Sequence, residues 1–170
     1  MLEWIIIIAI LAVVLITAYT LIVGAPPVPT PKRVASQMLE LAAIKPGETV
    51  YDLGSGDGRL IFAAAKQGAK AVGLEISPVM YPWSYLRKIA KRSPAQLRFR
   101  DFLWTDLSPA DVILIYMFPT TNELLLPKKL KRELKPGSRV ISLAFEIPGL
   151  DLQDKVKAKS YPGYIFSYQV

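Results

Sequence analysis

Three acidic residues and a run of glycines have the types and spacing of a ligand site. Asp52 precedes the glycines in YDLGSGDGRL, Glu75 ends VGLE, and Asp101 stands in RFRDF. Glycines allow a tight turn and let the backbone approach a ligand closely. Carboxylates attract cations and accept hydrogen bonds from hydroxyl and amine groups. The pattern therefore predicts a site for a ligand with hydroxyls, an amine and positive charge.

The spacing of the glycines excludes two common nucleotide-binding motifs. Gly54 and Gly56 match the first two glycines of the dinucleotide fingerprint G-x-G-x-x-G/A, but Arg59 stands where the third is required. The sequence contains no G-x-x-x-x-G-K-[ST], which excludes a P-loop. Asp52 would also repel a pyrophosphate, so a cationic or hydrogen-donating ligand is favoured.

S-adenosylmethionine, which carries an ammonium and a sulfonium, meets these requirements. A carboxylate at Glu75 can accept hydrogen bonds from both ribose hydroxyls. Asp101 can accept one from an exocyclic amine, with the ring of Phe102 beside it. A solvated loop charge would explain any single carboxylate, but three at successive strand ends, beside three glycines, favour one shared site.

The sequence contains no cysteine and no histidine. This excludes disulfides, thiolate chemistry, Cys/His zinc sites and a histidine general base, and we expect no metal site. Catalysis must therefore use carboxylates, tyrosine, lysine, backbone groups or a cofactor.

Alternating strands and helices must position these residues. Strands that alternate with helices form a parallel sheet, and ligands bind at the carboxyl ends of its strands. We therefore expect an α/β fold with a mostly parallel, Rossmann-like sheet that ends in a C-terminal antiparallel hairpin. The connections 102–110 and 146–154 are too short for full helices. The patterns predict helices over 32–43, 59–67, 79–91 and 122–134, and strands over 49–53, 69–75, 96–100, 111–117, 139–145, 155–160 and 164–168.

The first segment of the chain is strongly apolar. Residues 4–23 include no charged side chain, and a helix of that length crosses a hydrocarbon core of about 30 Å. We expect one transmembrane helix that is not cleaved, since a signal peptide needs a basic n-region. Lys32 and Arg33 follow this segment, so the positive-inside rule predicts a single-pass membrane protein with its catalytic domain on the cytoplasmic side.

The chain is expected to have three parts: an N-terminal transmembrane anchor (1–23), a proline-rich linker (24–31) and a catalytic domain (32–170). The linker GAPPVPTP holds four prolines and favours an extended spacer. All 21 Lys and Arg lie after residue 31, and the net charge is +7. This charge suits an anionic membrane surface. No aromatic-basic RNA motif accompanies it, so we expect no nucleic-acid partner.

The motifs D-L-G-S-G-D-G, V-G-L-E-I and R-D-F resemble motifs one to three of class I S-adenosylmethionine-dependent methyltransferases. More narrowly, VPTPKRV, YPWSYLRKIAKR, DFLWTDL and PTTNELLLPKKLKRELKPGSRVISLAF are similar to the membrane-anchored protein-lysine methyltransferases, the family that includes the enzyme modifying the ATP synthase c-ring protein. The resemblance implies methyl transfer from S-adenosyl-L-methionine to lysine side chains of a membrane or membrane-associated protein. The cofactor-binding residues expected from the motifs are Asp52, Gly54, Ser55, Gly56, Glu75, Ile76, Asp101 and Phe102.

The sequence after the fourth strand departs from one branch of that class. The D-P-P-Y-type motif of amine-methylating nucleic-acid enzymes is absent, and IYMFPT stands in its place. This disfavours methylation of a base. With no histidine to orient an acceptor amine, we expect Tyr116, Phe118 and Pro119 to position it, although Tyr116 and Phe118 would also suit a core or rim.

Two other functions stay open. A methyltransferase acting on a lipid, quinone or other small membrane-associated molecule would share every cofactor feature. A non-catalytic membrane module could also bind the cofactor without turnover.

Overall fold

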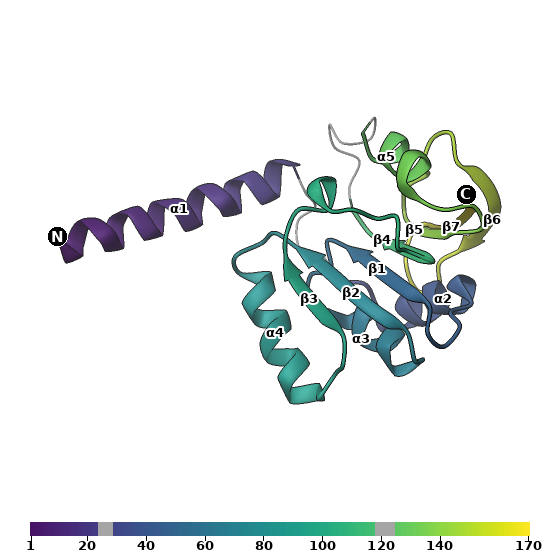
Figure 1. Cartoon of the computed structure of the whole chain (residues 1–170), viewed down its shortest axis with the longest axis horizontal. Coiled ribbons are helices and arrows are strands. Elements are labelled where there is room, and N and C mark those ends of the chain that lie inside the picture. Colours follow the sequence, from purple (N-terminus) through teal and green to yellow (C-terminus); the bar gives the residue numbers. More distant parts are fainter. Residues whose placement is uncertain (24–28, 118–124) are drawn as a thin grey trace.

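The centre of the molecule is a single mixed sheet. The computed structural model describes residues 1–23, 29–117 and 125–170, with the backbone alone at 17 and 19–23. Within these residues seven strands lie in the order β3-β2-β1-β4-β5-β7-β6 (Figure 1). β1 to β5 pair in parallel, and β7 runs antiparallel to both β5 and β6. The strands are β1 Thr49–Leu53, β2 Lys70–Glu75, β3 Gln96–Phe99, β4 Val112–Ile115, β5 Arg139–Leu143, β6 Asp151–Lys157 and β7 Tyr164–Gln169.

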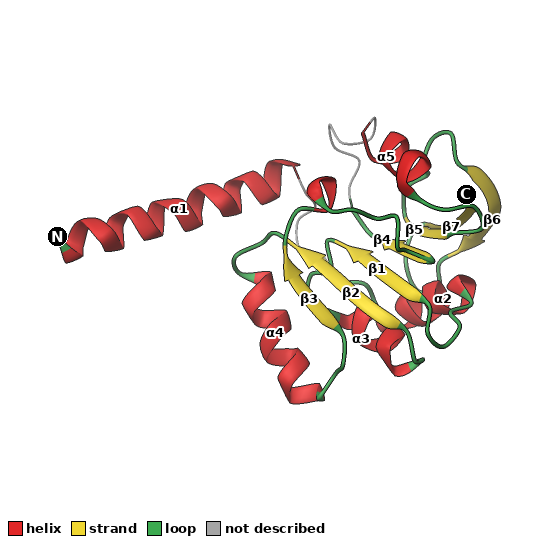
Figure 2. Cartoon of the chain, in the orientation of Figure 1, coloured by secondary structure: helices red, strands yellow, loops and turns green. Residues whose placement is uncertain are grey.

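Helices cover both faces of this sheet (Figure 2). α2 and α3 pack on one face, α5 packs on the other, and α4 lies against β3. The predicted Rossmann-like α/β architecture, mostly parallel with a C-terminal antiparallel hairpin, is confirmed. The helices are α1 Leu2–Val23, α2 Lys32–Ala42, α3 Arg59–Lys66, α4 Met80–Lys91, the 3-10 turn η1 Phe102–Trp104 and α5 Leu125–Glu133.

The apolar strands build two core clusters because successive side chains of a strand point to opposite faces. On β4, Leu114 belongs to the cluster beneath α2 and α3, which also contains Met38. Ile113 and Ile115 belong to the opposite cluster, with Leu130 of α5. Burial on both faces explains why β4 is an unbroken apolar run.

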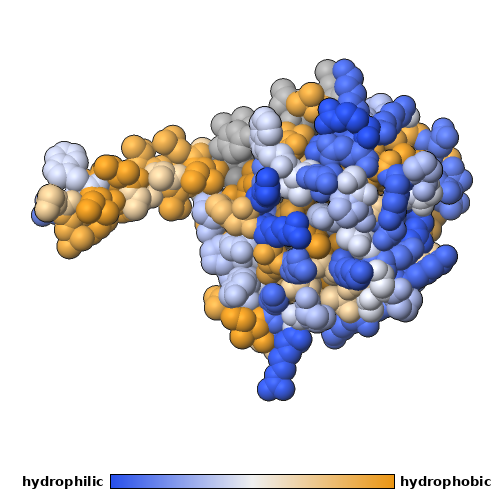
Figure 3. Space-filling model, viewed as in Figure 1, coloured by the Kyte–Doolittle hydropathy of each residue, from blue (hydrophilic) through white to orange (hydrophobic). Residues whose placement is uncertain are grey.

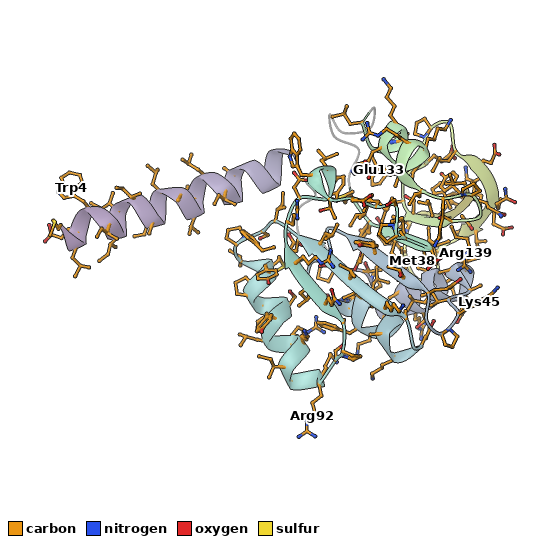
Figure 4. All side chains as sticks on the ribbon, in the orientation of Figure 1. Trp4, Met38, Lys45, Arg92, Glu133 and Arg139 are labelled. Carbon is orange, nitrogen blue, oxygen red and sulfur yellow. The ribbon has the colours of Figure 1, made fainter. Side chains whose placement is uncertain are left out.

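Ion pairs and capping contacts tie together the amino ends of the strands. Arg139 of β5 donates from Nη2 to Glu48 Oε2 at 2.6 Å and from Nη1 to the carbonyl of Ala43 at 2.8 Å (Figure 4). Lys135 Nζ lies 2.5 Å from Asp111 Oδ1. This end of the sheet is therefore held by interactions within the chain, in contrast to the carboxyl end.

Most predicted elements agree with the observed ones within two residues. The segment 102–110 holds no full helix, as expected, but only the turn η1. The strand predicted over 155–160 is misplaced, since β6 spans Asp151–Lys157. β6 is an edge strand with largely exposed side chains, so no alternation of buried and exposed residues marks it in the sequence.

The prediction of a transmembrane helix over 1–23 is wrong. Helix α1 exposes its apolar side chains (Figure 3), but no helix among the described residues is both long and apolar enough to cross a membrane. A span needs about 20 consecutive apolar residues, whereas the unbroken apolar run with described side chains covers only 4–16. The same finding overturns the predicted single-pass location with the catalytic domain on the cytoplasmic side. The predicted linker over 24–31 lies outside the described residues at 24–28.

Candidate functional site

The predicted site residues gather at the carboxyl ends of four neighbouring strands. In the parallel register, Leu53 of β1 is paired with Leu74 of β2 on one side and Ile115 of β4 on the other. Glu75 is paired with Phe99 of β3. The segments that follow these strands therefore share one edge of the sheet, where ligands of open α/β sheets bind.

The glycine loop between β1 and α3 is tied to the end of β2. The backbone N–H groups of Gly54 and Ser55 both donate to the carbonyl of Leu74 at 2.9 Å. Gly56 has a φ of +52°, and a Cβ added to it would meet no described atom closer than 4.0 Å. The loop thus presents bare backbone to open space, as close approach of a ligand requires.

Glu75 holds the glycine loop and the start of the next segment with its two carboxylate oxygens. Oε2 accepts a hydrogen bond from the Gly56 N–H at 2.7 Å, and Oε1 accepts one from the Ser77 N–H, also at 2.7 Å. Each carboxylate oxygen has a further lone pair. Glu75 can therefore accept hydroxyl hydrogens from a ligand while it keeps the loop in place. Ile76 follows it at the same edge and is half-buried.

Asp52 is a buried carboxyl group with no cation beside it among the described residues. Its relative exposure is 3%. Burial, followed by the negative charges of Glu75 and Asp57, raises the pKa of Asp52 to about 8. A buried carboxylate without a partner is costly, because it loses its hydration. A cationic ligand group would supply the missing partner.

Ser55 carries the one described side-chain polar atom that is buried without a hydrogen-bond partner. This atom is its Oγ, and the residue is 6% exposed. Buried polar groups are nearly always hydrogen-bonded. Together with Asp52 and Glu75, Ser55 fits S-adenosyl-L-methionine, which offers an ammonium, two ribose hydroxyls and further polar atoms.

The third predicted carboxylate has a structural partner of its own. Asp101 Oδ1 accepts a hydrogen bond from the Leu103 N–H at 2.8 Å and so caps η1. Phe102 is half-buried and packs with Met117 against the core cluster on the α5 side. One oxygen of Asp101 is thus used inside the chain, and Oδ2 has the geometry left to it for a ligand.

Tyr116 lies directly after β4, at the same edge as the carboxylates. Its hydroxyl donates to the hydroxyl of Tyr161 at 3.2 Å, and the two rings meet edge to face. Burial, and next the hydrogen bond with Tyr161, raises the pKa of Tyr116 above its ordinary value. Phe118 and Pro119, which were predicted beside it, lie outside the described residues.

Sequence reasoning missed a charged clamp on the glycine loop. Asp57 accepts from Arg59 Nη2 at 2.7 Å and pairs with Arg87 of α4, which also donates to the Asp57 carbonyl at 2.8 Å. Arg59 in turn donates to the carbonyl of the buried Thr30. Burial alone would raise the pKa of Asp57, but the two guanidinium groups outweigh it and hold that pKa below its ordinary value. Only the charge at Asp57 inside a glycine run could have pointed to this clamp.

Comparisons with known proteins agree with this site. The family model of the ANTKMT methyltransferase domain matches residues 52–154. A protein-lysine N-methyltransferase of Saccharolobus islandicus is 40% identical over 138 residues, which cover 79% of this chain and 85% of that protein. The human lysine N-methyltransferase of the ATP synthase c-ring protein is 34% identical over 72% of this chain, which spans about half (53%) of that relative's length.

A solved structure is similar over nearly its whole length. The RNA methyltransferase from Salinibacter ruber in complex with S-adenosyl-L-homocysteine has a TM-score of 0.77 and 33% identity, covering 84% of this chain and 94% of that one. The fold, the carboxylates at the strand ends and these matches lead to one conclusion. The chain belongs to the ANTKMT methyltransferase domain family and is a methyltransferase that uses S-adenosyl-L-methionine.

Proposed function

We propose that this enzyme methylates lysine side chains of a protein. The observation that carries the proposal is the 40% identity with a protein-lysine N-methyltransferase over 79% of the chain. The position of Tyr116 supports it, because a hydroxyl stands after β4 where the chain has neither histidine nor cysteine to orient an amine.

The residues of the chain have distinct parts in the proposed reaction. When bound, S-adenosyl-L-methionine supplies a methyl group on a positively charged sulfur. Asp52 attracts the cationic end of the cofactor, Glu75 accepts its hydroxyl hydrogens, and Tyr116 orients the acceptor amine. In-line methyl transfer depends on alignment, so positioning alone can account for much of the rate.

The acceptor lysine must react as the neutral amine, although its reference pKa is about 10.4. A poorly hydrated site and a nearby positive charge both disfavour the ammonium form and lower that pKa. No histidine is present to remove the proton. The proton therefore leaves to water as the lysine enters the site, before the nitrogen attacks.

We extend the proposal to a lysine of a membrane protein. Support comes from relatives: one is named as a methyltransferase of the ATP synthase c-ring protein, and a mouse relative, 34% identical over 68% of this chain, as one of adenine nucleotide translocase. These names describe the relatives and give the first acceptors to test with this enzyme.

The direct test is mass spectrometry of proteins labelled in vitro. The purified protein is incubated with methyl-deuterated S-adenosylmethionine and separate membrane and water-soluble protein fractions, and labelled lysines are mapped. We expect labelled lysine in a membrane polypeptide, and loss of labelling with Glu75→Gln but not with Glu40→Gln on the exposed face of α2. Label found only in lipid extracts would replace the proposal with a small-molecule methyltransferase.

RNA is the second candidate acceptor. The observations that favour it are the 33% identity with an RNA methyltransferase and the net charge of +7. The same labelling reaction with total RNA separates the two functions. Deuterated methyl groups on nucleosides, with none on lysine, would establish RNA as the substrate.

A further inference from the structure

The turn between β6 and β7 brings Tyr161 to the end of β4. The hydroxyls of Tyr116 and Tyr161 lie 3.2 Å apart, and the ring centroids lie 6.1 Å apart with planes at 89°. The two residues are 45 positions apart in the sequence, and both are half-buried. The C-terminal hairpin therefore contributes a side chain to the proposed acceptor site.

The backbone of this turn is specialised to hold the Tyr161 ring. Ser160 has a φ of +63°, which is costly for a residue with a side chain and is found mostly where function or packing requires it. A Cβ on Gly163 would come within 2.9 Å of Tyr161 Cε1, so only glycine leaves room for the ring. Ala144, at the end of β5, also has a positive φ of +73° beside the turn.

Helix α2 anchors the same turn from the other side. The buried Gln37 donates from Nε2 to the carbonyl of Lys157 at 3.1 Å and accepts from the Lys159 N–H at 2.9 Å. Arg33 adds a contact with the hydroxyl of Ser160 at 3.4 Å. Three elements, α2, β4 and the hairpin, thus fix the position of the Tyr161 hydroxyl.

The hydrogen bond restricts what Tyr116 can do to an amine. A phenol has one hydrogen to donate and lone pairs to accept with. While Tyr116 donates to Tyr161, only its lone pairs face a substrate, so it can accept an amine N–H. A free Tyr116 hydroxyl could instead donate to the nitrogen lone pair and block the atom that must attack.

We propose that Tyr161 is a positioning residue that holds the Tyr116 hydroxyl as a hydrogen-bond acceptor for the substrate amine. This inference rests on the proposed function, in which Tyr116 orients the lysine nitrogen. It assigns a part in catalysis to the C-terminal hairpin.

A double-mutant cycle tests the assignment. Initial rates of methyl transfer to lysine in a total protein extract are measured for Tyr116→Phe, Tyr161→Phe and the double variant. We expect each single change to slow transfer about three- to tenfold, the size of one net hydrogen bond, without changing the cofactor Kd. The double variant should be no slower than Tyr116→Phe, because Tyr161 acts only through Tyr116. Multiplying effects would overturn the inference.

Two further measurements separate this inference from a general loss of folding and from the proposed function. Tyr164→Phe, which removes an exposed hydroxyl of the same hairpin, should keep wild-type rates. Tyrosine Cζ NMR titration should show a lower pKa for Tyr116 in Tyr161→Phe, and an unchanged titration would refute the contact. An active enzyme with an additive cycle would overturn this inference alone, whereas absence of lysine methylation by the wild type would overturn the proposed function with it.

Discussion

Glu75 Oε2 accepts a hydrogen bond from the Gly56 backbone N–H at 2.7 Å, so the residue expected to bind ribose also fixes the glycine loop. In Glu75→Gln, one of these contacts must face an amide NH₂ group, which cannot accept. Because hydrogen bonds to charged groups are worth about 1.5–3 kcal/mol, we expect the cofactor Kd to rise about ten- to a hundredfold. Isothermal titration calorimetry measures this, with Glu40→Gln as control. A Kd within twofold of wild type would show that Glu75 does not bind the cofactor.

Asp52 should make cofactor affinity depend on pH. Its pKa is raised to about 8 in the free protein, so the carboxyl is protonated at neutral pH. A cationic ligand favours the ionised form, and binding therefore releases a proton. Affinity should rise about tenfold per pH unit below pH 8 and level off above it. Calorimetry in buffers of different ionisation enthalpy measures the proton release, which should vanish in Asp52→Asn.

The same residue should lower the stability of the free protein at high pH. Because the pKa of Asp52 is higher in the folded than in the unfolded state, the folded state loses stability as pH rises from about 4 to about 8. Asp52→Asn removes this loss, so the variant should be more stable than wild type at pH 8, by up to a few kcal/mol, and similar at pH 4. Urea unfolding at both values measures it. Equal stability at pH 8 would contradict the burial of an uncompensated charge.

Removal of Arg87 should loosen the glycine loop. Arg87→Met leaves Asp57 with Arg59 alone and frees the Asp57 carbonyl. We expect a loss of about 1–3 kcal/mol in the free energy of unfolding and a weaker cofactor Kd. Arg92→Met is the matched control, since Arg92 points away from the body at the end of α4 (Figure 4). If both variants behave alike, the clamp does not support the loop.

The sequence was sufficient to predict the sheet and the edge that holds the site. Buried strands such as β4 are continuous apolar runs, and parallel topology then places the residues that follow them at one edge. This is why Asp52 and Glu75, 23 residues apart, could be assigned to one site before their burial or hydrogen bonds were known.

Contacts between distant segments could not be predicted in this way. Tyr161 stands in Tyr-Pro-Gly, which indicates a turn but not where its side chain points. Arg87 reaches Asp57 across 30 positions only because α4 packs beside the loop. The apolar N-terminal segment misled for the opposite reason: composition alone suggested a span that the described helix does not provide.

The exposed side chains that obscure β6 in the sequence have an effect at the rim of the sheet. β6 is an unpaired edge, and such an edge can recruit a strand from another molecule. Asp151, Asp154, Lys155 and Lys157 place charges of both signs along it, and Lys155 lies over the rings of Tyr164 and Phe166. A second copy that docked there would have to strip water from these charges. The sheet can thus end without a covering helix and still resist aggregation.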